Sequence, residues 1–169
     1  MAAGPTYEPI GTTTLSSAQA GVSFDISSAS NQNYTDLVLV LSTRFSNKGT
    51  GQENTYIRFN NDASSIYGNT YLGNLTSGNI NSQQQLYISA GGNEISERYS
   101  VAVFNFFNYS NSTTYKHGTW SYGFPNNHMQ LWAGVWMSTA AITTVGILGG
   151  GSSLFAIGST FTLYGIKAA

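Results

Sequence analysis

The chain contains no cysteine, only three prolines and two histidines, and few charged residues. Without cysteine, disulfides and thiolate metal sites are excluded, and the redox compartment cannot be read from the sequence. Charged residues make up 8% of the chain, whereas about 25% is usual in soluble proteins. The basic residues are scattered singly, so we expect no stripe that could neutralise nucleic-acid phosphates. They are Arg44, Lys48, Arg58, Arg98, Lys116 and Lys167.

The chain also lacks any apolar run close to the roughly 20 residues that a membrane-spanning helix needs. We therefore expect no membrane partner. Low charge can accompany disorder, but 41% hydrophobic and 14% aromatic residues supply enough material for a core. The length of 169 residues fits one domain. The net charge of -1 lies close to zero, which favours self-association.

Glycine, serine, threonine and asparagine take the place of charged residues, and this mixture is typical of short strands joined by tight turns. Alternation of side-chain type with a period of two predicts about ten strands and no helix longer than a single turn. Residues 76–83 are interpreted as a polar loop. The predicted strands are 22–26, 36–45, 55–59, 67–75, 84–90, 99–109, 113–122, 131–137, 142–148 and the C-terminal segment 158–169. The sequence therefore predicts an all-β protein, an antiparallel jelly-roll-like β-sandwich.

The strongest alternating segments predict which side chains form the core. In 36–45, Leu37 and Leu39 share one face while valines occupy the other, which is typical of a central strand covered on both sides. The segment 99–109 is the longest and most aromatic of the predicted strands. From these patterns we expect burial of Leu37, Leu39, Val101, Val103, Phe161 and Leu163.

The aromatic residues suggest two kinds of site. Trp132 and Trp136 lie four residues apart in a predicted strand, so they share a face, with Gly134 between them. This pattern favours the core or a subunit interface over a platform for sugar rings. Four tyrosines lie in polar surroundings and are candidates for a subunit interface or a glycan site. They are Tyr56, Tyr67, Tyr71 and Tyr87.

No segment carries a catalytic or metal-binding pattern. The acids are dispersed over the N-terminus, strand edges and turns, where capping is the simplest role. His117 and His128 are not in close register, as a metal pair would be, so we expect them to be polar surface or interface residues. A proton switch at a subunit contact is the alternative for each. We therefore expect no enzymatic activity and no cofactor.

The first ten residues differ from the rest of the chain. Their two prolines fix φ and remove backbone donors, so segment 1–10 is predicted to be extended, and it has too little apolar surface to fold alone. We predict an extended N-terminal arm over residues 1–10 and a β-sandwich domain over residues 11–169. The arm would dock onto a partner. Its candidate docking residues are Pro5, Tyr7, Glu8, Pro9 and Ile10.

Several blocks of the chain resemble small virion proteins of tailed bacteriophages. They are 6–15 (TYEPIGTTTL), 34–41 (YTDLVLVL), 57–62 (IRFNND), 136–143 (WMSTAAIT) and 159–168 (STFTLYGIKA). The blocks span most of the chain in the expected order, and none is a catalytic signature. Proteins with such blocks include capsid decoration (cement) proteins and tail-fibre or receptor-binding modules.

The resemblance implies a non-enzymatic structural protein of the virion, made in the bacterial host cytoplasm and located on the outer capsid surface. Its implied partners are the major capsid protein, whose shell it would stabilise, and further copies of itself. Three-fold sites in capsids imply a homotrimer. A receptor-binding module at the tail tip, which recognises a host surface glycan, is the alternative. No nucleic-acid partner is expected under either interpretation.

Overall fold

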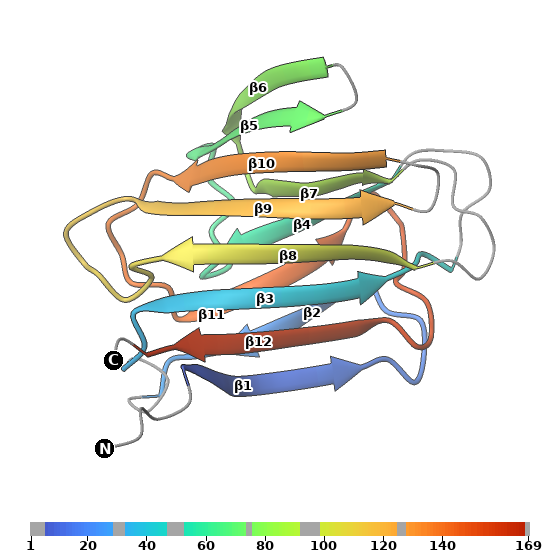
Figure 1. Ribbon diagram of the computed structural model, residues 1–169, viewed down its shortest axis with the longest axis horizontal. Coiled ribbons are helices and arrows are strands. Elements are labelled where there is room, and N and C mark those ends of the chain that lie inside the picture. The colour runs from blue at the N-terminus through green and yellow to red at the C-terminus, as the bar shows by residue number, and fades with distance from the viewer. Residues whose placement is uncertain are drawn as a thin grey trace.

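The computed structural model describes residues 6–28, 33–46, 53–73, 76–91, 99–124 and 128–167. Within these ranges the regular secondary structure is all β-strand, arranged as two antiparallel sheets that lie one behind the other (Figure 1). The prediction of an all-β sandwich is confirmed. The jelly-roll assignment stays a prediction, because this strand order does not establish it. The described ranges contain no helix of the length and apolarity needed to cross a bilayer.

The larger sheet has eight strands, and the first and last strands of the chain pair at one edge of it. In spatial order its strands are β1 (Tyr7–Thr14), β12 (Thr160–Ile166), β3 (Asp36–Thr43), β8 (Ser100–Phe107), β9 (Lys116–Phe124), β10 (His128–Trp136), β5 (Tyr67–Gly73) and β6 (Thr76–Gln83). The smaller sheet has four strands. Their order is β2 (Gly21–Asp25), β11 (Thr144–Gly149), β4 (Glu53–Phe59) and β7 (Leu86–Gly91).

The N-terminal strand β1 begins inside the segment predicted as an arm. Residues 7–10 belong to β1 and pair with β12, with a register irregularity between Pro9 and Gly11. Proline is tolerated here because β1 is an edge strand, where a missing N–H breaks no second ladder. The sandwich therefore starts at Tyr7 and not at residue 11. Pro5 lies outside the described residues.

The edge strand β6 occupies residues 76–83, which the sequence predicts as a loop, so that prediction is wrong. The segment lacks apolar alternation, because Ile80 is its one large apolar residue. Backbone pairing with β5 makes it a strand, and Ile80 packs against the core. A strand that forms mainly through backbone hydrogen bonds to its neighbour cannot be recognised from the pattern of its own side chains.

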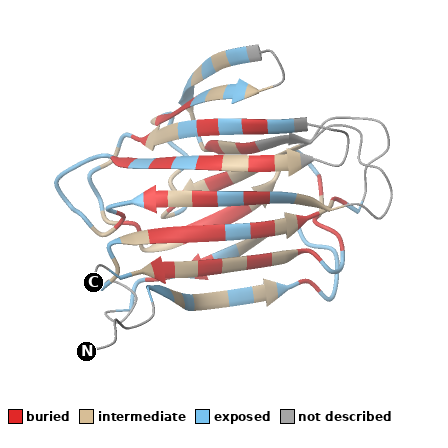
Figure 2. Cartoon of the chain, in the orientation of Figure 1, coloured by how far each residue is buried: buried red, intermediate tan, exposed pale blue. Residues whose placement is uncertain are grey.

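The core lies between the two sheets, and buried and exposed residues alternate along most strands (Figure 2). Most of the predicted core residues are buried in it. These are Leu37, Leu39, Phe161 and Leu163.

The predicted burial of Val101 and Val103 is wrong, because their side chains are 54% and 40% exposed. Both belong to β8, whose two faces each carry apolar residues. The inward positions are taken by Ala102, Phe104 and Phe106. Burying two phenylalanines removes more apolar area from water than burying two valines, which decides the orientation of the strand.

Large aromatic rings fill the middle of the core. Trp120 stacks on Phe104 and on Trp132, with ring centroids 5.1 and 5.9 Å apart. Trp136 packs 5.6 Å from Phe59. All three tryptophans are buried, so Trp132 and Trp136 lie in the core, the first of the two places that their spacing favours. No tryptophan ring is therefore open to a sugar.

Candidate interaction surface

The broadest surface of the molecule is the outer face, defined as the outward residues of the eight-stranded sheet. Figure 1 looks onto this face, with the four-stranded sheet behind it. One row of paired, uncharged residues crosses the whole sheet. In spatial order the row is Thr12, Thr162, Val40, Val103, Ser121, Leu131, Leu72 and Ser77.

Every large apolar side chain that is exposed within a described strand lies on the outer face. These side chains are Tyr7, Val40, Leu72, Val101, Val103, Phe107, Met129 and Leu131. A set of exposed apolar side chains gathered on one face of a molecule is a common mark of an interaction site.

The middle of the outer face is shaped as a trough between two ridges. The floor of the trough is the part of β9 over residues 119–123, whose outward residues are small: Thr119, Ser121 and Gly123. The ridges stand on β8 and β10 and consist of Val101, Val103, Met129 and Leu131. Two open depressions of about 390 and 230 Å³ lie along the trough.

The floor has room for a larger side chain. A Cβ added at Gly123 would first meet Cγ2 of Val101, at an ordinary 3.7 Å. The hollow is thus a consequence of residue size on β9 and not of a distorted sheet.

The outer face carries almost no charge. Among its described side chains, Asp36 is the one acid, and its Oδ1 accepts a hydrogen bond from the backbone N–H of Asn108 at 2.8 Å. His117 is exposed on the same face, whereas the side chain of His128 lies outside the described residues. An uncharged partner surface would therefore lose little hydration energy on contact, while a charged one would lose much.

The outward side of the four-stranded sheet is different in chemistry. Arg58 on β4 donates from Nη2 to Oε1 of Gln85 at 2.7 Å. Tyr56 and Tyr87 pack edge to face with centroids 4.9 Å apart, and Asn54 donates to the Tyr56 hydroxyl at 3.2 Å. These side chains contact one another within the chain, and Nε of Arg58 is left buried without a hydrogen-bond partner.

The four candidate tyrosines do not form one site. Tyr56 and Tyr87 lie half-buried on the four-stranded sheet, and Tyr71 lies half-buried on β5 against Trp132. The prediction of an exposed or interface position is wrong for Tyr67, which is fully buried. Its hydroxyl accepts from the Phe59 N–H at 3.1 Å, and burial raises its pKa. Sequence neighbours gave no sign of this, because Tyr67 contacts residues of another strand.

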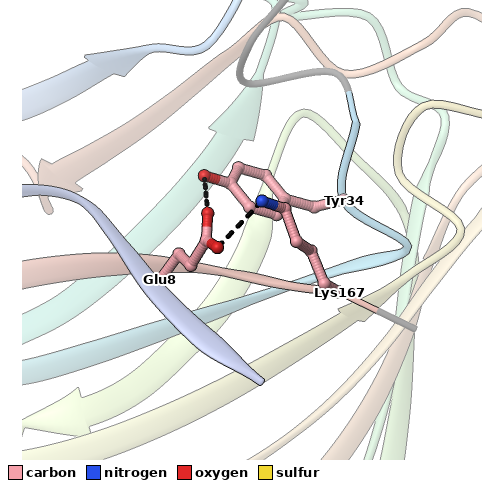
Figure 3. Close-up of polar contacts among 3 residues, drawn as sticks. All are labelled: Glu8, Tyr34 and Lys167. Carbon is pink, nitrogen blue, oxygen red and sulfur yellow. Dashed lines mark hydrogen bonds and ion pairs between the residues drawn. The ribbon is translucent and has the colours of Figure 1, made fainter. Parts of the chain in front are cut away.

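The two chain ends are joined by a polar cluster of three side chains, shown in Figure 3. Lys167 donates from Nζ to Oε1 of Glu8 at 2.8 Å, and the Tyr34 hydroxyl donates to Oε2 at 3.1 Å. The hydrogen bond from Lys167, with that from Tyr34, lowers the pKa of Glu8. Glu8, predicted to be free for docking, is thus engaged within its own chain, and Ile10 packs against the core.

The other acids with described side chains hold turns. Asp25 accepts from the Ser27 N–H at 2.9 Å, as capping residues do. Asp62 accepts from the Ser64 N–H and from the Trp136 indole, each at 2.9 Å. The described residues include no group of three or more acids or histidines placed to hold a metal ion.

Lys116 is a buried cation that the sequence did not reveal. It is 2% exposed, and its Nζ donates to the carbonyls of Thr114 at 2.7 Å and Thr139 at 3.2 Å. Burial lowers its pKa. Because both partners are backbone carbonyls of segments that flank β9 and β10, the role that this geometry supports is the fastening of two loops.

No family model matches the chain, and no curated protein or solved structure matches it either.

Proposed function

We propose that the protein is a non-enzymatic structural protein of a tailed-phage virion, bound to the capsid shell as a decoration protein. The observation that carries the proposal is the outer face, a broad surface with almost no charge and with exposed valine, leucine and methionine. Apolar burial over such a face can hold copies of the chain together, and an assembly that docks on the shell at many equivalent sites converts weak contacts into avidity. The resemblance of the sequence blocks supplies the virion setting.

We propose that the N-terminal strand contacts the shell with fewer residues than the sequence predicted. Tyr7 is 58% exposed and, like Pro9, stands at the β1 end of the outer face, whereas Glu8 and Ile10 are engaged within the chain. The proposed contact to the major capsid protein therefore involves Tyr7, Pro9 and the residues before them. Removing residues 1–5 leaves every contact described above intact, so the sandwich should keep its melting temperature while losing affinity for the shell.

The alternative is a receptor-binding module at the tail tip that recognises a host glycan. Its support is weaker, because the tryptophans are buried and the four candidate tyrosines are half-buried or buried. The exposed tyrosine and phenylalanine rings among the described residues are Tyr7, Phe107 and Tyr115.

Counting copies of the chain in purified virions by quantitative mass spectrometry tests the proposal. Hundreds of copies per particle would support capsid decoration, and a handful would support the tail alternative. Absence of the chain from intact virions would overturn both.

A further inference from the structure

We propose that the outer face binds a second copy of this chain, through a two-fold axis parallel to the strands and midway between β8 and β9. This inference concerns self-association and does not depend on a virion location. Three properties of the outer face carry it: its shape, its charge and its size.

The shape of the outer face is complementary to itself. A two-fold axis between β8 and β9 sets the β8 ridge of each copy opposite the β9 trough of the other. In this arrangement Val101 faces Gly123 and Val103 faces Ser121, because each of these pairs already shares a row of the sheet. Large residues thus meet small ones on both sides of the axis.

The same axis lies at the middle of the eight-stranded sheet, with four strands on each side of it. All eight strands therefore overlap with all eight of the second copy. On the next pair of strands, Met129 of β10 faces Ser42 of β3, and Leu131 faces Val40, again within shared rows. Twist rotates packed sheets by about 30°, which leaves the central strands in closest contact.

Charge favours a second copy over a charged partner. Two copies of a charged face would repel each other, but among the described side chains of this face the one acid is Asp36, whose carboxylate is already hydrogen-bonded at the end of β3, and the one histidine is His117. The threonine, serine and valine side chains of the central strands contact other uncharged side chains of the second copy, so no ion is buried without a partner.

The size of the face matches what a stable dimer needs. Eight strands at about 4.8 Å spacing, each about 25 Å long, give a face of roughly 900 Å². A standard interface buries about 800 Å² on each partner. A smaller ligand would cover only part of the exposed apolar residues.

The first test measures the mass of the full chain in solution by light scattering and analytical ultracentrifugation at micromolar concentration. The unaltered protein should be a dimer. Ser121→Arg places a charged side chain on the trough floor and should weaken dimerisation by about tenfold or more, because an unpaired charge would be buried. Ser23→Arg, at an exposed position on β2 of the other sheet, is the matched control and should leave the dimer intact.

Circular dichroism and melting temperature establish that both variants fold. Should Ser121→Arg fail to fold, Gly123→Leu fills the trough without charge, at a position with free space. A monomeric or trimeric unaltered protein would overturn the proposal, and so would dimers that survive both trough substitutions. A trimer found in hundreds of copies on virions would overturn this inference and leave the proposed function standing.

A cross-linking experiment tests the geometry of the pair. The chain has no cysteine, so Val40→Cys combined with Leu131→Cys introduces the only thiols. Within one chain these positions are three strands, about 14 Å, apart, beyond the reach of a short bismaleimide. Across the proposed axis they face each other, so covalent dimers are expected. A double variant with Leu131→Cys and Ser23→Cys should give none, and equal yields from both would contradict the proposed axis.

Discussion

The two sheets enclose one core, yet their outward sides have different chemistry. On the four-stranded sheet, Arg58 bonds Gln85 and the rings of Tyr56 and Tyr87 pack together, so polar and aromatic groups find partners within the chain. On the eight-stranded sheet, the outward ridges of β8 and β10 expose apolar side chains over a trough of small ones.

This difference indicates that the outward side of the four-stranded sheet is suited to contact with water, and that of the eight-stranded sheet to contact with a partner. Hydrogen-bonded groups gain little from a new contact, since their partners are already in place. Exposed apolar side chains gain about 25 cal/mol for each Å² that a partner covers. The predictions below test this contrast between the two sides and the core that they share.

The largest effect is expected from the shared core. Leu39→Ala on β3 removes a fully buried side chain and should lower the free energy of unfolding by about 2–5 kcal/mol. Ser23→Ala, at an exposed position of β2, should change it by less than about 0.5 kcal/mol. Urea unfolding measures both, and a Leu39→Ala loss below about 0.5 kcal/mol would contradict the inward orientation of β3.

Alanine substitutions at two glycines compare the effect on stability of an inward and an outward position of the eight-stranded sheet. Gly165 on β12 faces inward, and an added Cβ would collide with the Tyr34 ring. Gly165→Ala should therefore cost about 1–3 kcal/mol in the free energy of unfolding. Gly123→Ala on the trough floor meets nothing closer than 3.7 Å and should be neutral or slightly stabilising. Thermal unfolding in dilute solution checks the pair, and equal losses would contradict the assigned faces.

Acid should weaken the turn that connects the two sheets. Burial alone would raise the pKa of Asp62, but hydrogen bonds from Ser64 and Trp136 and the charge of Arg58 hold it below its usual range. Because the folded pKa is the lower one, this stabilisation is present above the unfolded pKa, about 4, and is lost as pH falls through the folded pKa. Asp62→Asn should flatten the fall in stability below about pH 4, measured by urea unfolding at a series of pH values. An unchanged pH profile would exclude this carboxylate as a source of acid sensitivity.

The smallest effect is expected on the four-stranded sheet. Arg58→Met removes the hydrogen bond to Gln85 and should cost about 1 kcal/mol or less, since the side chain is half-buried and its partner is a neutral amide. It should leave the dissociation constant of the dimer unchanged, as measured by ultracentrifugation. A variant on this side that weakens association as strongly as Ser121→Arg would remove the distinction between the two faces.

Much of the architecture could be predicted from local pattern. Regular alternation in 36–43 and 160–166 identified strands whose inward residues, such as Leu39 and Leu163, are buried. The prediction failed where pattern was absent, in β6, or present on both faces, in β8. In β8 the one hint was Asn105, which shares the outward side with Val101 and Val103.

The candidate surface was harder to predict than the strands. Each of its rows combines residues from several strands, and the trough exists only because small residues of β9 fall between larger ones of β8 and β10. Tyr67 and Lys116 were missed for a similar reason, since their burial comes from segments distant in sequence.

The sequence by itself determined the class of fold: low charge, frequent turn residues and a period of two leave an antiparallel all-β chain as the outcome, because these are local properties of the backbone. Only the tertiary structure decided which apolar face of β8 turned inward, that Glu8 pairs with Lys167, and that the exposed valines gather on one face with almost no charge. The physical reason is that burial is a competition between distant segments for one limited core, and a strand with two apolar faces cannot settle that competition alone.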